Sequence, residues 1–373
     1  MRSARSWAAL LLLALPACGG SEDSGYDLIL VSVDTLRADR LPFYGAERDT
    51  GGNPAQPFTP SWLAAQGTLF ESCWSTAGQT LPSLANFWTG LPPLEHGAIS
   101  NGVPFVVPSR LLALRKNRFD ESHALVANMS LAPGCRLEQG FDTYAVMAKQ
   151  DERDIPKTML SLTQAAVKGH KRLVTWTHFM TPHQPYTPTA ELAARYHGQL
   201  GQPADNKFLY DRHRDGKVDE ALRETVRGMY DGEVRQASDY VREFLSGLDA
   251  QYRSAGRGGL LQNAVVVFFA DHGEELGDRH GYFMHAKSLY SGVIHVPLLV
   301  IGPGWTAGER RAPALELGEV LPMVLDGRTP ERTLFFSAWK AGFYAVRDER
   351  WTLVHNPGDD RAGPEEPPLD AAY

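Results

Sequence analysis

The chain has little cysteine, no block of basic residues and no internal repeat, and each absence narrows the range of functions. Its three cysteines, Cys18, Cys73 and Cys135, stand alone in the sequence, so a cysteine-based metal cluster is excluded. Its 37 basic and 44 acidic residues give a formal net charge of −7, and we therefore expect no nucleic-acid partner. With 43% hydrophobic and 22% charged residues, the composition is that of an ordinary globular protein.

The apolar run near the N-terminus is too short to cross a bilayer as a permanent helix. Residues 1–17 begin with positive charge, continue with leucine and alanine and end in small residues, the pattern of an export signal. The Leu-Pro-Ala-Cys sequence that ends at Cys18 resembles a bacterial lipobox. We therefore predict a lipoprotein signal peptide over 1–17, lipidation of Cys18 and a flexible tether over 18–25; a plain cleaved signal peptide is the alternative. The prediction places the protein in the cell envelope, periplasmic or at the outer membrane, bound to a membrane through its lipid anchor.

The remaining two cysteines leave two interpretations open. In an exported protein, Cys73 and Cys135 could form one disulfide bond. Two buried free thiols are an equal alternative, because the sequence does not specify pairing.

Apolar strands alternate with helices along most of the chain. Strands are predicted at 26–34, 122–130, 171–179, 264–271 and 295–302. The first of them is apolar along its length, as in a parallel sheet covered on both faces. A short helix is predicted over 58–67 and a long amphipathic helix within 216–250. This order predicts an α/β fold with a mixed, mostly parallel central sheet and helices on both faces.

We predict one catalytic domain over 26–326 and a small C-terminal β subregion over 327–357. The subregion has aromatic, roughly alternating segments, which indicate a small antiparallel hairpin. Residues 358–373 are acidic and rich in proline, and we expect them to be a disordered tail.

Two predicted strands end in side chains that bind metal ions. One strand stops at Asp34, and another stops at Asp271, which His272 follows. In open parallel sheets, ligands bind beyond the carboxyl ends of the strands, so we expect these groups to share one divalent metal ion. A capping carboxylate and a polar turn are the ordinary alternatives for each group taken alone.

Thr80 lies in a hydroxyl-rich segment, 75–83, that leads into a predicted helix at 84–97. A hydroxyl at a helix N-terminus gains from the helix dipole, and a metal-bound threonine would be acidified. By spacing alone, capping the helix is the more common use of such a threonine.

Seven stretches, in order, resemble the sulfatase branch of the alkaline phosphatase superfamily and cover roughly residues 26–305. They include SVDTLRADRLPFYG (32–45), TLPSLANFWTGLPPLEHG (80–97), THFMTPHQPYTP (177–188) and the stretch ADHGEELGDRHGYFMHAK that begins at Ala270. The resemblance implies an alkaline phosphatase/sulfatase-like fold and a metal-dependent enzyme that cleaves a tetrahedral ester.

The resemblance also implies a role for each matching residue. The metal ligands are Asp34, Thr80, Asp271 and His272, and the ion is manganese, zinc, magnesium or calcium. The catalytic set is Thr80, His183 and His285. The substrate contacts are His183, His285, Lys287 and His178; a satisfied core histidine is an even alternative for His178.

Three departures from the sulfatase pattern favour a phosphoester over a sulfate ester as the substrate. Thr80 cannot be converted to formylglycine, Leu84 replaces the arginine that closes the motif, and Thr35 replaces a second aspartate. A threonine at this position resembles the lipoteichoic acid synthases and phosphoethanolamine transferases, which use it as a covalent phosphoryl acceptor. We therefore predict phosphoester chemistry, by hydrolysis or transfer, with Thr80 as the nucleophile.

Two other functions stay open at this stage. One is a sulfuric ester hydrolase that works without formylglycine, and the other is a catalytically inactive surface lipoprotein that binds its ligand. The expected substrate is a small-molecule, lipid or glycan ester, and the sequence specifies neither its leaving group nor the oligomeric state.

Overall fold

The computed structural model describes residues 25–330, 332–339, 343–348, 350–355 and 371–372. A nine-stranded sheet forms the centre of the molecule, in the order β4-β3-β5-β1-β6-β7-β2-β8, with β9 paired to β2. Strands β4, β3, β5, β1 and β6 run parallel to one another, and β7 runs antiparallel to both β6 and β2. The strands are β1 (Asp27–Val33), β2 (Thr68–Trp74), β3 (Glu121–Val126), β4 (Thr143–Val146), β5 (Leu173–Phe179), β6 (Ala264–Ala270), β7 (His295–Ile301), β8 (Glu309–Arg311) and β9 (Leu315–Glu316).

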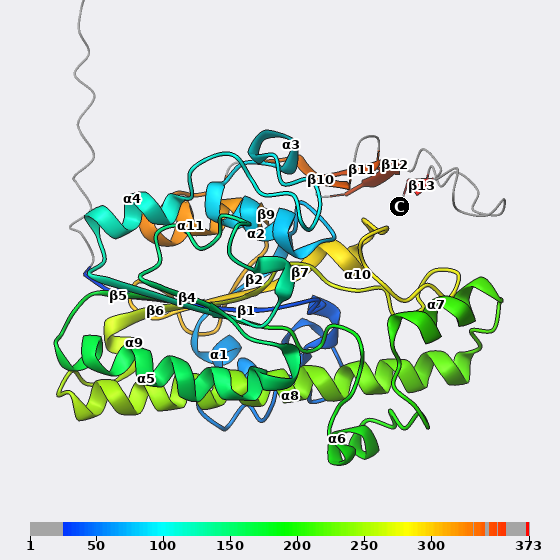
Figure 1. The fold of residues 1–373 in the computed structure, drawn as a ribbon, viewed down its shortest axis with the longest axis horizontal. Coiled ribbons are helices and arrows are strands. Elements are labelled where there is room, and N and C mark those ends of the chain that lie inside the picture. The colour runs from blue at the N-terminus through cyan, green and yellow to red at the C-terminus, as the bar shows by residue number, and fades with distance from the viewer. Residues whose placement is uncertain (1–24, 331, 340–342, 349, 356–370, 373) are drawn as a thin grey trace, which may run out of the picture.

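Helices cover both faces of this sheet (Figure 1). One face carries α1 (Pro60–Gln66), α5 (Ile155–Lys168), α8 (Glu220–Ser254) and α9 (Leu260–Asn263), and the other carries α2 (Thr80–Thr89), α4 (Arg110–Asn117) and α11 (Leu317–Asp326). The predicted fold class is therefore confirmed. The shorter helices are α3 (Pro93–His96), α6 (Ala190–Arg195), α7 (Asn206–Arg214), α10 (Ser291–Ile294), η1 (Ala38–Arg40), η2 (Pro42–Tyr44), η3 (Met129–Leu131) and η4 (Lys149–Asp154).

The central strands are buried on both faces, which explains why they are apolar throughout. Every residue of β1, β5 and β6 is buried. Aromatic rings fill the space between β5 and α2, where the rings of Trp88 and Trp176 lie 5.7 Å apart. This core fixes the strand ends relative to α2, because close-packed interiors allow little displacement.

Most of the predicted elements are present at the predicted positions. Thr59 caps α1 by accepting a hydrogen bond from the backbone nitrogen of Trp62, and α8 begins and ends within four residues of the predicted stretch. The strand β2 was not predicted, because the polar residues Glu71 and Ser72 interrupt its apolar pattern.

The C-terminal region forms a second sheet that is larger than the predicted hairpin. Strands β10 (Phe335–Trp339), β11 (Phe343–Arg347), β12 (Thr352–His355) and β13 (Ala371–Ala372) are antiparallel neighbours. Its buried face packs against Leu289, Val293 and Ile294. Of the predicted disordered tail, 371–372 form β13, and the other residues lie outside the described part of the chain.

Of the two interpretations left open for Cys73 and Cys135, the structure agrees with two buried free thiols and not with a disulfide bond. Cys73 lies on β2, whereas Cys135 lies near Tyr144 of β4, and five strands separate β2 from β4. At about 4.8 Å per strand, this separation is far beyond the reach of a disulfide bond. The predicted signal peptide and lipidated Cys18 lie outside the described residues, among which no helix is long and apolar enough to cross a membrane.

Candidate active site

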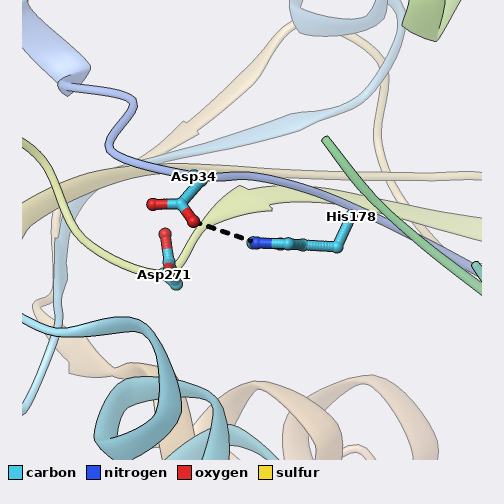
Figure 2. A group of neighbouring side chains, drawn as sticks. All are labelled: Asp34, His178 and Asp271. Atoms are coloured by element: carbon cyan, nitrogen blue, oxygen red, sulfur yellow. Dashed lines mark hydrogen bonds and ion pairs between the residues drawn. The ribbon is translucent and has the colours of Figure 1, made fainter. Parts of the chain in front are cut away.

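The carboxyl ends of three neighbouring parallel strands bring Asp34, His178 and Asp271 together (Figure 2). Asp34 follows β1 and Asp271 follows β6, and the last residues of these strands, Val33 and Ala270, are paired. His178 lies on β5 on the other side of β1, with its Nε2 atom 3.3 Å from Asp34 Oδ2. All three side chains are completely buried.

These three side chains fit a divalent cation. One ligand atom from each lies within 4.8 Å of the others. Asp34 Oδ1 and Asp271 Oδ2 are buried and have no hydrogen-bond partner among the described residues. Burying unpaired carboxylate oxygens is costly, and a cation that accepts both as ligands would remove that cost.

The two carboxylates differ in their electrostatic environment. Burial alone would raise the pKa of Asp34, but the hydrogen bond to His178 and the neighbouring histidines outweigh it and hold that pKa below its usual value. Burial and the charge of Asp34 raise the pKa of Asp271 well above its usual value. Without a cation, the site therefore favours one ionised and one protonated carboxyl group.

His272 also points its Nε2 atom at this group. Its Nδ1–H donates to the carbonyl of Gly273 at 2.9 Å, so Nε2 keeps its lone pair in the neutral ring. Nε2 lies 3.7 Å from Asp34 Oδ1 and 3.5 Å from Asp271 Oδ2. Burial lowers the pKa of His272 to about 3, which keeps the ring neutral and able to bind a metal.

His178 is held by a polar chain that reaches into the core. Its Nδ1 lies 2.8 Å from Ser32 Oγ, which also accepts a hydrogen bond from Trp176 Nε1 at 2.8 Å. The ring therefore has a fixed orientation, with Nε2 directed at Asp34. The sequence placed His178 among the substrate contacts, whereas the geometry places it among the groups that could hold a metal ion.

Thr80 is the first residue of α2 and lies beside the two carboxylates. It is 1% exposed, and its Oγ1 is 3.5 Å from Asp34 Oδ2 and 3.4 Å from His272 Nε2. The helix-capping alternative is wrong, because Gln79 occupies the cap position and Thr80 is already helical. The N-terminus of α2 directs its dipole at this hydroxyl, which favours negative charge there.

His183 and His285 form the next layer of the site. The ring centroid of His285 lies 4.6 Å from that of His272 and 5.1 Å from that of His183. His183 Nδ1 donates to the carbonyl of Gln184 at 2.7 Å, and His285 Nδ1 donates to Glu274 Oε1 at 2.9 Å. Burial lowers the pKa of both histidines, that of His285 to about 4. Both Nε2 atoms therefore keep a lone pair and are available to accept a proton or a hydrogen bond.

Two residues of the site were missed at the sequence level, Asn128 and Glu274. Asn128 follows β3 and donates to both Asp34 and Thr80. The strand-end argument would have found it if the strand had been ended at Val126 rather than at residue 130. Glu274 lies inside the turn after His272 and also accepts a hydrogen bond from Tyr186, at 2.5 Å. Lys287 is exposed, unlike the other predicted site residues.

A partly buried ion pair holds the loop that carries His183. Lys149 Nζ lies 3.0 Å from Glu233 Oε2 on α8 and donates to the carbonyl of Pro185 at 2.8 Å. Glu233 also accepts from the backbone nitrogen of Thr187 at 2.7 Å. The segment that follows His183 is therefore bound to α8 through Glu233, which limits the positions that the His183 ring can adopt.

His96 is the last residue of α3, which contacts α2, and its burial predicts a pH dependence of stability. It is fully buried, and burial lowers its pKa to about 4. The unfolded chain binds this proton near pH 6.5, so stability rises with pH between about 4 and 6.5. Through His96 alone, we expect the free energy of unfolding to be roughly 2 kcal/mol lower at pH 4.5 than at pH 7.

Urea titrations of His96→Asn at both pH values test this expectation. Asparagine keeps an acceptor for the backbone nitrogen of Ala98, which now donates to His96 Nδ1 at 3.1 Å. The difference in stability between the two pH values should shrink by that amount, whatever the variant does to stability at pH 7. An unchanged difference would contradict the assignment.

Comparisons with known proteins agree with this fold. The family model described as Sulfatase matches residues 27–326. Arylsulfatase K of Bos taurus is 30% identical over 124 residues, which covers 33% of this chain and 21% of that protein. Arylsulfatase K of Homo sapiens is 28% identical over 124 residues, covering 33% of this chain and 22% of that protein. The match thus spans about a fifth of the length of these curated relatives.

Solved structures resemble this chain over a larger part of its length. The phosphonate monoester hydrolase from Silicibacter pomeroyi has a TM-score of 0.66 and 17% identity, covering 90% of this chain and 87% of that one. A 2-O GAG sulfatase has a TM-score of 0.63 and 14% identity, covering 89% of this chain and 82% of that one. At these identities, the likeness shows the fold alone.

Proposed function

Because the chain belongs to the sulfatase family, we propose that it is a metal-dependent enzyme that cleaves phosphate- or sulfate-type esters, with Thr80 as the covalent nucleophile and phosphoester chemistry favoured. The observation that carries the proposal is the position of Thr80 Oγ1, 3.5 Å from Asp34 Oδ2 and 3.4 Å from His272 Nε2. An oxygen placed beside a metal-binding group and an unprotonated imidazole is suited to attack.

Asp34, Asp271, His178 and His272 would hold the metal ion. When bound, the ion supplies positive charge that stabilises the oxygens of the ester group and of Thr80. Four residues from the ends of three strands would thus share one cation, which agrees with the lack of hydrogen-bond partners for Asp34 Oδ1 and Asp271 Oδ2 among the described residues.

The side chains themselves perform the rest of the reaction. Thr80 gives its hydroxyl proton to Asp34 Oδ2 as its Oγ1 attacks phosphorus, a new O–P bond forms, and the bond from phosphorus to the leaving oxygen breaks. His183 or His285 takes up a proton from solvent on its free Nε2 atom and gives it to that leaving oxygen. Water or an acceptor alcohol then attacks the phosphothreonine, and Thr80 regains its proton as the O–P bond opens.

The charges around Thr80 favour a substrate whose phosphorus group carries a single negative charge. The hydrogen-bond partners of Thr80 Oγ1 in the described residues are Asp34, Asn128 and His272, none of which is a permanent cation. Leu84, at the position of the motif arginine, is fully buried and apolar. A dianionic phosphate monoester would need additional positive charge, so a phosphodiester or phosphonate monoester fits better.

The testing experiment is a screen of purified enzyme with manganese, zinc, magnesium and calcium. The substrates are p-nitrophenyl esters: a phosphate monoester, a phosphodiester, a phenylphosphonate monoester and a sulfate. We expect metal-dependent turnover, with kcat/KM for the diester or the phosphonate at least about tenfold above that for the sulfate, an advantage of roughly 1.4 kcal/mol. Faster sulfate release would favour the alternative of a sulfuric ester hydrolase without formylglycine. No turnover and no bound metal would favour an inactive binding lipoprotein.

A further inference from the structure

Asn128 lies at the same sheet edge as the metal-binding side chains. It follows β3, which pairs with β5, and the backbone nitrogen of the preceding Ala127 donates to the carbonyl of His178 at 2.9 Å. The side chain is 4% exposed. Its position is therefore set by the same strands that position His178.

Hydrogen bonds fix the orientation of the Asn128 amide. Its Oδ1 accepts from the backbone nitrogen of Ser130 at 2.8 Å, which caps η3. Its Nδ2 donates to Asp34 Oδ2 at 2.5 Å and to Thr80 Oγ1 at 3.2 Å. A flipped amide would set its oxygen against the Asp34 carboxylate and its NH2 group against the Ser130 N–H, and both contacts are repulsive.

This orientation decides how the Thr80 hydroxyl uses its own proton. The amide nitrogen only donates, so Thr80 Oγ1 must accept from Asn128. The Thr80 hydroxyl must then donate to another acceptor, and the carboxylate oxygen Asp34 Oδ2 lies within reach at 3.5 Å. Asn128 thereby directs the Thr80 hydroxyl proton towards a base, while its own amide N–H stays hydrogen-bonded to Thr80 Oγ1.

We propose that Asn128 is a catalytic residue whose amide stabilises negative charge on Thr80 Oγ1. This inference rests on the proposed function, because it takes Thr80 as the nucleophile. In the first step, the Thr80 proton passes to Asp34 Oδ2, Oγ1 forms its bond to phosphorus, and the bond from phosphorus to the leaving oxygen breaks. The amide hydrogen bond strengthens as charge develops on Oγ1. In the second step, water or an acceptor alcohol forms a bond to phosphorus, the bond from phosphorus to Oγ1 breaks with its electron pair returning to Oγ1, and the same donor stabilises that oxygen until it is reprotonated.

Two substitutions test the proposal in the full-length metal-loaded protein, with a p-nitrophenyl phosphodiester as substrate. Asn128→Ala removes the donor. Asn128→Asp also removes it, but keeps an oxygen for the Ser130 N–H and so preserves the cap of η3. Loss of one preorganised donor typically lowers kcat by about 10²–10³-fold, and we expect this loss in both variants, with KM changed by less than about threefold. Rapid-quench experiments should show slower formation and slower breakdown of phosphothreonine at position 80.

Asn263→Ala is the matched control. Asn263 Nδ2 also makes two hydrogen bonds, to the carbonyls of Arg257 and Gly259, but at the opposite end of β6. We expect this variant to lose stability without the fall in kcat. Manganese affinity, measured by calorimetry, separates a role at Thr80 from a role at Asp34: the proposal expects a change of less than about tenfold in the Kd of Asn128→Ala, below 1.4 kcal/mol.

The possible outcomes distinguish failure of the role of Asn128 from failure of the proposed function. If Asn128→Ala keeps kcat within tenfold of the native enzyme, or if saturating manganese restores its full activity, the proposal is overturned. If phosphothreonine never forms in the native enzyme, the proposed function fails with it. If phosphothreonine forms while Asn128→Ala stays fully active, only the role of Asn128 fails.

Discussion

Replacing Thr80 with alanine is expected to lower kcat by about 10⁴-fold or more, because the attacking oxygen is lost. The fold should survive, since Thr80 Oγ1 bonds only within the site and α2 does not depend on it for capping. Turnover of a p-nitrophenyl phosphodiester and mass spectrometry of a quenched reaction measure the effect. The native enzyme should show a phosphorylated Thr80 and the alanine variant none.

Two further variants make this test specific. Thr80→Ser keeps the hydroxyl and should retain activity to within roughly tenfold. Thr89→Ala removes a buried threonine at the other end of α2, where Oγ1 donates to the carbonyl of Ala85, and should leave kcat unchanged. Full turnover by Thr80→Ala would show that another group attacks the ester.

Replacing Asp271 with asparagine should abolish metal binding and activity while making the metal-free protein more stable. Burial and the charge of Asp34 raise the pKa of Asp271, so at neutral pH the folded metal-free protein carries an unfavourable carboxyl group. A raised folded-state pKa means that stability is lost as pH rises above the unfolded value near 4. Asparagine removes this cost, and we expect a gain of about 1–3 kcal/mol in the metal-free state.

Thermal unfolding with and without metal measures both effects. A cation at 100 times its Kd should stabilise the native protein by about 2.7 kcal/mol and should leave Asp271→Asn unchanged. Asp239→Asn, on α8 and paired with Arg235, is the control and should respond to metal as the native protein does. If Asp271→Asn keeps its response to metal, the ion binds elsewhere and the site assignment is wrong.

The sequence indicated much of this fold because the central strands are buried on both faces. Burial on both faces requires mostly apolar runs such as those of β1 and β6, and this pattern distinguishes them from solvent-exposed segments. Strand β2 escaped prediction because two polar residues interrupt its pattern, and the C-terminal sheet was underestimated because its strands have one exposed face.

The candidate site was predicted in part for the same reason. Asp34 and Asp271 stand at the ends of apolar runs, and the parallel arrangement makes those ends neighbours. Thr80 was selected through family resemblance, since its spacing alone indicated a cap. Asn128 stands just beyond the end of β3 and was missed because the predicted strand ran on to residue 130. Glu274 follows no comparable signal, because its partners Tyr186 and His285 come from other segments of the chain.

The sequence by itself determined which segments are buried strands and which carboxylates end them, since local apolar runs and strand alternation require no knowledge of partners. Only the tertiary structure decided which atoms meet: that His178 turns its Nε2 atom to Asp34, that Asn128 reaches Thr80, and that the two cysteines lie apart. The physical reason is that strand order and side-chain direction depend on the packing of the whole sheet, which no local stretch of sequence contains.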